Sequence, residues 1–209
     1  MRQDDAAVHI GLHVVFLSWI VALLTLSQLA PGFYFEVLQE DRFVEWLTAT
    51  VFIAAAALRL SFAWQTRRVF DGLVGLFCIF VGGEEFSWGQ RLFGFMPPAV
   101  FLERNTQQEF TVHNFADVFG EPKGVLILAL LGYGLLLPLA RRFGLRSFLD
   151  RVGATAPSLR LVPWFVIAAG LLIWYPVDLT GEWVEALAAV LFLVSVPPLR
   201  RSGSWFAGA

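Results

Sequence analysis

The sequence predicts an all-α polytopic membrane protein, a bundle of about six transmembrane helices forming one domain over residues 1–209. Hydrophobic residues make up 57% of the chain and charged residues only 15%, which is too apolar for an ordinary soluble domain. The mean hydropathy of +0.68 agrees. A further observation is that the basic residues cluster in alternate connections between the apolar runs.

The first apolar run, residues 9–30, is long enough to cross a bilayer, because ~20 apolar residues suffice. A cleaved signal peptide is the alternative interpretation. However, the run exceeds an h-region of ~7–15 residues, and Pro31 follows the only plausible small-residue cleavage position, Ala30. We therefore expect a retained helix.

The second and third spans are expected to meet at a basic turn. Residues 43–64 are apolar apart from Glu45 and Arg59, which we expect to reach the membrane interfaces. The pair Arg67–Arg68 closes this span. Residues 69–91 then run through the apolar segment GLVGLFCIFVGG into a pair of acids and form the third span.

The remaining spans are separated by polar connections. Residues 95–121 begin with a proline pair and mix aromatic with polar side chains, so we expect an amphipathic connection along the outer membrane surface. The fourth span, 124–140, precedes a basic loop. The fifth, 161–175, ends before a proline, and the sixth, 183–199, ends before two arginines.

The Lys/Arg distribution predicts the orientation of these spans in the membrane. With both termini cytoplasmic, the inner side collects most basic residues: Arg2, Arg59, Arg67, Arg68, Arg141, Arg142, Arg146, Arg151, Arg160, Arg200 and Arg201. The outer side keeps Arg42, Arg91, Arg104 and Lys123. Most acids fall on the outer side. Because every basic cluster lies on the inner side, the positive-inside rule favours this topology.

Two classes of partner or framework are not expected. No basic block or basic helix face appears, so membrane lipids rather than nucleic acid are the expected surroundings. The single cysteine, Cys78, lies in an apolar run, which excludes a disulfide framework and indicates a buried core residue.

Chemically capable side chains concentrate in residues 82–114, which begin with an acidic pair, Glu84 and Glu85. Helix rise places Glu84 about 24 Å beyond Arg68, inside a hydrocarbon core of about 30 Å. Carboxylates at this depth are costly and normally face a protein interior or a water-filled cavity. We therefore predict that one of the two acids is a primary functional group.

If the third helix continues through this motif, Glu84, Ser87, Trp88 and Arg91 share one stripe of its surface. An interfacial anchor is the alternative, with the indole at headgroup level and the arginine paired to glutamate. The pair Gly82–Gly83 favours close helix packing and hence a buried site. A Ser-His-acid triad is not favoured, because FSWGQ lacks the strand-turn-helix elbow of such a serine.

A second polar face is expected in the following connection. In a helix, Asn105, Glu109 and His113 lie within roughly 80° of arc, with Gln108 adjacent. Glutamate and histidine four residues apart can orient an imidazole for acid/base chemistry or bind a divalent metal such as zinc. A solvated surface helix is the alternative. The other histidine pair, His9 and His13, lies at the inner end of the first span and is expected to be structural or interfacial.

These residues form the predicted site. The candidate catalytic residues, which are also the candidate metal ligands, are Glu84, Glu85, Glu109 and His113. The candidate substrate-binding residues are Trp88, Gln90, Arg91, Asn105, Gln108 and Asn114. The supporting carboxylates, expected on the same side from the second and sixth spans, are Glu45, Glu182 and Glu185.

The segments EDRFVEWLTA, GGEEFSWGQRLFGF and NTQQEFTVHN resemble a family of bacterial integral membrane proteins with an EExSWGQR box and a following Gln/Glu/His-Asn box. The resemblance covers residues 40–114 and implies no assigned activity. A fainter similarity is to the intramembrane CAAX-type proteases, whose first box also opens with two glutamates and has an arginine further on. It implies glutamate-activated hydrolysis, with Glu84, Glu85 and Arg91 at the matching positions.

Two classes of function follow from the sequence. The first is a membrane-embedded hydrolase or transferase acting on a lipid, lipid-linked or peptide substrate near the outer leaflet, through buried carboxylates as general base or metal ligands. The second is a non-catalytic protein that binds or transports a cation or basic solute, or serves as a structural subunit. The absence of acids deep in the first, fourth and fifth spans disfavours a continuous ion path.

Overall fold

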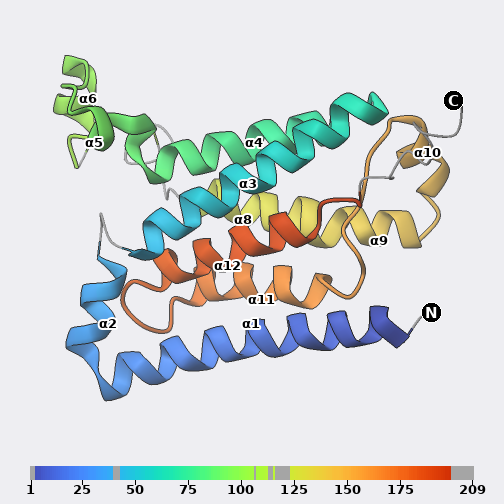
Figure 1. Cartoon of the computed structure of the whole chain (residues 1–209), viewed down its shortest axis with the longest axis horizontal. Helices are drawn as coiled ribbons and strands as arrows, with labels where there is room; N and C mark the ends of the chain where they lie inside the picture. Colours follow the sequence, from blue (N-terminus) through green and yellow to red (C-terminus); the bar gives the residue numbers. More distant parts are fainter. Residues whose placement is uncertain (1–2, 40–42, 106, 113–114, 116–122, 199–209) are drawn as a thin grey trace, which may run out of the picture.

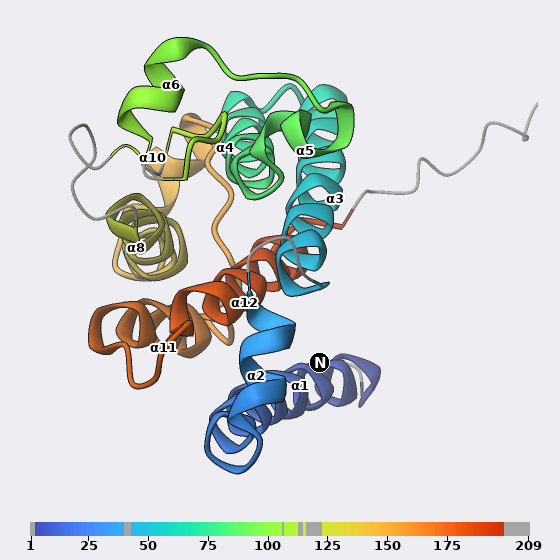
Figure 2. The ribbon, with the colours of Figure 1, turned by 90° about the vertical axis from the view of Figure 1, so that its left-hand side faces the viewer.

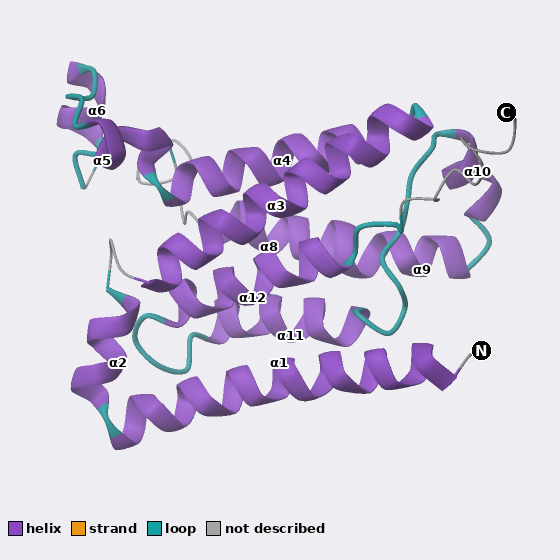
Figure 3. Cartoon of the chain, in the orientation of Figure 1, coloured by secondary structure: helices purple, strands orange, loops and turns teal. Residues whose placement is uncertain are grey.

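The computed structural model describes residues 3–39, 43–105, 107–112, 115 and 123–198. Every regular element in these ranges is a helix (Figure 3), which confirms the predicted all-α class. The longer helices are α1 (Gln3–Leu29), α3 (Phe43–Thr66), α4 (Val69–Glu85), α8 (Lys123–Leu131), α11 (Val162–Trp174) and α12 (Thr180–Val194). The shorter ones are α2 (Pro31–Leu38), η1 (Ser87–Gly89), α5 (Gln90–Phe93), α6 (Ala99–Arg104), η2 (Gly132–Leu136), α9 (Leu137–Arg142) and α10 (Arg146–Arg151).

Three helical segments are long and apolar enough to cross a membrane: Ile10–Leu29, Phe43–Thr66 and Lys123–Arg142. The third is a continuous run of α8, the π-helical η2 and α9. These segments point to a membrane protein. Helices α4, α11 and α12 have 17, 13 and 15 residues. They are therefore between about 20 and 26 Å long, short of a hydrocarbon core of about 30 Å.

Helix α12 lies at the centre of the bundle, between α3 and α11 (Figure 2). Its side chains are buried on all sides, and Trp183, Leu191 and Phe192 are at most 1% exposed. Polar contacts attach α1 to this centre. The Trp19 indole donates to the Trp183 carbonyl at 3.0 Å, and the Trp164 indole donates to His13 Nδ1 at 2.5 Å.

The bundle has two chemically different ends (Figure 1). We call the end that carries the starts of α3, α8 and α12 and the end of α4 the acidic end, since Glu45, Glu85, Glu182 and Glu185 lie there. The opposite, basic end carries the turn between α3 and α4 and helices α9 and α10, with Arg67, Arg68, Arg141 and Arg146.

The third predicted span ends earlier than expected. Helix α4 stops at Glu85, and Ser87, Trp88 and Gly89 have φ angles of 50°, 51° and 84°. This left-handed backbone is typical of a sharp helix break. The prediction of one continuous stripe containing Glu84, Ser87, Trp88 and Arg91 is therefore wrong.

The predicted helical face between residues 95 and 121 is also wrong where the structure describes it. Helix α6 ends at Arg104, the described residues 107–112 are non-helical, and an isolated antiparallel bridge pairs Asn105 with Phe115. The left-handed Gln108 (φ 57°) is incompatible with a helix that continues through this segment. The sixth predicted span is displaced as well, because α12 covers Thr180–Val194.

Arg59 does not reach an interface as the sequence predicted. Its side chain is fully buried, and Nη1 donates to Asp71 Oδ1 at 2.6 Å. The same guanidinium donates to the Tyr133 hydroxyl, to the Ser195 carbonyl at 2.8 Å and to Thr155 Oγ1 at 3.2 Å. Helices α3, α4 and α12, segment η2 and the loop before α11 are thereby joined at one point. The fully buried Cys78 confirms its predicted core role.

Segment η2 reaches this network because Gly134 allows Phe165 of α11 to pack directly on its backbone. A Cβ atom at Gly134 would lie 2.1 Å from Phe165 Cγ, whereas one at Gly132 would meet nothing within 4 Å. The contribution of the sequence GYG, residues 132–134, thus lies in tertiary packing. Its tertiary role is to let Tyr133 and Phe165 approach, with ring centroids 5.9 Å apart.

We predict that Gly134→Ala destabilises the purified protein by about 1–3 kcal/mol through overpacking. The matched control is Gly132→Ala in the same turn, which has open space and should leave the melting temperature unchanged or raise it slightly. Thermal unfolding in detergent measures both. Equal melting temperatures for the two variants would contradict the close packing of Gly134 against Phe165.

Candidate functional site

The site at the acidic end begins with the break after α4. Gly83 leaves room for the indole of Trp88 to fold back over the helix end, because a Cβ there would lie 2.9 Å from the indole ring. In this position Trp88 Nε1 donates to Glu84 Oε1 at 2.6 Å. The left-handed residues after Glu85 therefore turn the tryptophan back onto the glutamate one turn before it.

Glu84 also fixes the connecting loop. Its second oxygen, Oε2, accepts the backbone N–H of Val112 at 2.6 Å, and the residue is only 4% exposed. Both carboxylate oxygens are thus engaged by donors from the protein. A carboxylate that accepts two charge-assisted hydrogen bonds in a buried place is a strong positional restraint. We conclude that Glu84 holds residues 107–112 against the end of α4.

Arg91 forms the second connection of this loop. Its guanidinium donates to Glu45 on α3, with Nη1 to Oε1 at 3.0 Å, and also donates to Glu109 Oε1. Ser87 Oγ completes the group by donating to Glu109 Oε2 at 2.9 Å. The three ionic side chains are each about 13–15% exposed, so their pairing is screened less than a surface ion pair.

Other predicted substrate-binding residues also stabilise the loop. Gln90 Oε1 accepts the backbone N–H of Phe110 at 2.6 Å. Asn105 is 3% exposed and donates through Nδ2 to the Thr111 carbonyl at 2.8 Å. Gln108 is exposed at the tip of the turn. The structure therefore gives Gln90 and Asn105 a local structural role that the sequence did not predict.

An aromatic cluster supports the same loop from the other side. The ring of Phe101 on α6 lies 4.7 Å from that of Phe110 and 5.0 Å from that of Phe115, measured between centroids. Phe95 packs edge-on against Phe110 at 5.8 Å. These contacts hold α6 and the loop together, so the polar residues beneath them have fixed positions.

We call the contacts of Glu84, Ser87 and Arg91 with Glu45, Glu109 and the loop the clamp. A second group of carboxylates, which includes Glu85, lies beside it. Glu85 interacts electrostatically with four other carboxylates, Glu45, Glu84, Glu182 and Glu185. Lys123 at the start of α8 is the basic group that interacts with Glu185. The Lys123 ammonium lies over the Tyr175 ring, 3.7 Å from its centroid. The side-chain hydrogen bonds among the described residues include neither Glu85 nor Glu185.

The structure therefore divides the predicted catalytic set. Glu84 and Glu109 belong to the clamp, whereas Glu85 lies with the supporting acids of α12. Among the described residues, no group of three or more His, Cys, Asp or Glu side chains has the arrangement of a metal site. The predicted ligands Glu84, Glu85 and Glu109 thus do not form one by themselves. His113 and Asn114 lie outside the described residues, so their predicted roles are untested.

Sequence reasoning missed three features of this end. Lys123 was assigned only to the outer side, because a lysine at the first position of an apolar helix normally reaches the membrane interface. Tyr175, whose ring lies under the Lys123 ammonium, was predicted only as the end of the fifth span. The hydrogen bonds donated by the backbone N–H groups of Phe110 and Val112 could not be predicted from the sequence, because they depend on the path of the loop.

The fold and this end define the class of protein: an all-helical membrane protein with a carboxylate-rich site at one end of its bundle. No family model, curated protein or solved structure matches the chain.

The two adjacent acids should respond differently to loss of charge. Glu84→Gln replaces an acceptor oxygen by an NH₂ group facing either the Trp88 indole or the Val112 amide, so one donor loses its partner. We expect a loss of about 1–3 kcal/mol in stability. Glu85→Gln removes repulsion from four carboxylates and should leave the melting temperature unchanged or raise it. The measurement is thermal unfolding of both purified variants. A larger loss of stability in Glu85→Gln than in Glu84→Gln would contradict the different roles given to the two acids.

Proposed function

We propose that the protein is a multi-pass protein of the bacterial inner membrane with six spans, both termini cytoplasmic and the acidic end outside. Support comes from the separation of charge between the two ends of the bundle, which matches the positive-inside rule. Helices α4, α11 and α12 are short for full spans but run alongside α3 and α8 in the bundle, so neighbouring helices would shield their ends.

Labelling of single cysteines in whole cells tests this topology. In a Cys78→Ala background, we expect Gln107→Cys to react with a membrane-impermeant maleimide and Arg146→Cys to react only after the membrane is opened. Both positions are exposed, so a failure to react cannot result from burial of the cysteine within the protein. Equal labelling of the two positions in intact cells would exclude the six-span orientation.

We further propose that the acidic end is the site of an enzyme, a hydrolase or transferase that acts on a lipid, lipid-linked or peptide substrate near the outer leaflet. One observation carries this proposal. Glu85 and Glu185 come from different helices and interact electrostatically. Neither takes part in the hydrogen bonds that form the clamp among the described residues.

Two carboxyl groups from different helices can divide an acid/base reaction between them. One carboxyl group, in its ionised form, accepts the proton of a water or hydroxyl nucleophile while the oxygen of that nucleophile attacks the substrate. The other, protonated, gives its proton to the leaving group as the bond to it breaks. Glu84 and Arg91 act as positioning residues, because they fix the loop and the end of α4 beside the reacting carboxyls. His113 remains a predicted further member of the site.

The test is complementation of a gene deletion followed by mass spectrometry of the cell's lipids and lipid-linked intermediates. We expect the activity of Glu85→Gln and of Glu185→Gln to fall about 100-fold or more, as on removal of a general acid or base. The protein level and the melting temperature of both variants should stay normal. Glu36→Gln is the control, since Glu36 is an exposed acid on α2 near the same end. Full complementation by both Glu85→Gln and Glu185→Gln would contradict the proposal that the acidic end is the site of an enzyme.

Binding of a cation is the second candidate, and the excess of acids over bases at this end favours it. Four carboxylates, Glu45, Glu85, Glu182 and Glu185, gather here with Lys123 and Arg91 as the nearby bases. Elemental analysis and titration with zinc or manganese would detect such binding. Stoichiometric metal that is lost in Glu85→Gln, together with an unchanged lipid profile on deletion, would favour binding over catalysis.

A further inference from the structure

A polar cavity lies at the basic end, opposite the carboxylate site. It has a volume of about 450 Å³, and its lining includes Arg68 and Arg141 together with the hydroxyl residues Thr155, Ser158 and Ser195. Its remaining walls are apolar and come from α1, α11 and the end of α12, with Leu12, Leu161 and Val194. The cavity therefore combines cationic and hydroxyl groups with hydrocarbon walls.

The two arginines supply the charge of this cavity. Arg68 precedes α4 and packs on the left-handed Gly153 (φ 70°), where an added Cβ would lie 3.6 Å from its Cγ. No ion pair of Arg68 occurs within the described part of the chain. Arg141 pairs with Asp150 at 2.9 Å, and its side chain is 33% exposed. A phosphate oxygen could therefore be bound by Arg68 while Arg141 adds a second charged donor.

The floor of the cavity is rigid because it belongs to the buried Arg59 network. Thr155 Oγ1 donates to Asp71 Oδ1 at 2.5 Å, and Ser195 Oγ donates to the Phe192 carbonyl at 2.8 Å. The protons of these two hydroxyls are thus directed inward. Ser158 differs, because its Oγ accepts the Arg160 N–H at 3.4 Å and keeps its own proton for a ligand.

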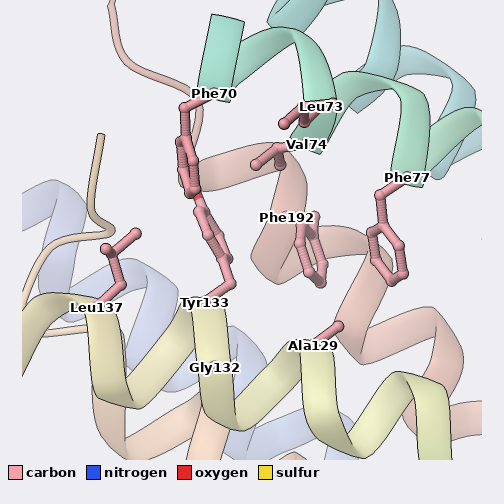
Figure 4. A pocket seen from close by; sticks show the side chains of 9 residues that line it. All are labelled: Phe70, Leu73, Val74, Phe77, Ala129, Gly132, Tyr133, Leu137 and Phe192. Carbon is pink, nitrogen blue, oxygen red and sulfur yellow. The ribbon is translucent and has the colours of Figure 1, made fainter. Parts of the chain in front are cut away.

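A purely apolar cavity lies near the other side of this network and serves as a comparison. It has a volume of about 300 Å³, lies between α4 and η2, and has Phe70, Phe77, Tyr133 and Phe192 in its wall (Figure 4). No charged residue lines it. It can take hydrocarbon but not an anion, so the arginines distinguish the polar cavity from this apolar one.

We propose that the cavity at the basic end binds a phosphate group carried by an amphiphile or by a small phosphorylated solute. Guanidinium groups match phosphate geometry and hold it by charge-assisted hydrogen bonds. Basic cavities between transmembrane helices are also known to receive anionic lipid headgroups. The walls formed by Leu12, Leu161 and Val194 can pack against the carbon atoms next to the phosphate. This site is independent of the carboxylate chemistry at the acidic end.

The test uses the full-length protein in a maltoside detergent, which contains no phosphate. Phosphatidylglycerol, inorganic phosphate and oleate are each added, and binding is read from the melting temperature and from native mass spectrometry. Arg68→Gln is the principal variant. It should fold, since the Arg68 side chain makes no capping hydrogen bond to α4. Arg67→Gln is the matched control, because Arg67 is exposed, stacks on Trp64 at 4.9 Å and is absent from the cavity wall.

We expect phosphatidylglycerol to stabilise the wild type and Arg67→Gln, with affinity reduced about tenfold or more in Arg68→Gln. Oleate should bind both variants equally. Stabilisation by inorganic phosphate at matched ionic strength, lost in Arg68→Gln, would identify a phosphorylated solute as the ligand. Equal binding of phosphatidylglycerol by the two variants, or no stabilisation of the wild type by either phosphate probe, would overturn the proposal.

Discussion

The rest of the bundle depends on one buried charge, the guanidinium of Arg59. Removing an arginine from water costs several kcal/mol unless the charge is paired and its N–H groups are bonded. Asp71 supplies the countercharge, and oxygens of Tyr133, Thr155 and Ser195 accept further protons of the two terminal nitrogens. The buried Nε–H has no hydrogen-bond partner among the described residues. These acceptors come from four separate parts of the chain. Burial of Arg59 is therefore possible only when α3, α4, η2, α12 and the loop before α11 are all in place.

The two ends of the bundle use their charges differently. At the acidic end, a clamp made by Glu84 and by Arg91 with Glu109 holds the loop on the end of α4. The carboxylates of Glu85 and Glu185 lie beside this clamp but are not part of its hydrogen bonds within the described residues. A rigid support with chemically available groups next to it is the arrangement expected of a functional site. At the basic end, the Arg59 network provides the rigid support, and Arg68 is the available group.

The helix break after Glu85 connects local conformation to this arrangement. Ser87 and Trp88 have positive φ angles just before Gly89, and this conformation is unfavourable for residues other than glycine unless the surroundings stabilise it. The hydrogen bond from Trp88 to Glu84 and that from Ser87 to Glu109 provide such stabilisation. Without the break, Arg91 would continue along the axis of α4, and it would not return to Glu45 on α3.

The sequence by itself determined the helical class, the apolar segments and the separation of basic from acidic ends, because composition and hydrophobic run length depend only on local residues. It also indicated a candidate site, since charged side chains stand out in an apolar chain. Only the tertiary structure decided which acids are engaged. Glu84 and Glu85 are adjacent and chemically identical, and their roles differ because Val112 and Trp88 reach one while α12 faces the other. Arg59 was misassigned for the same reason, since snorkelling and burial differ only in whether distant acceptors such as Tyr133 are present.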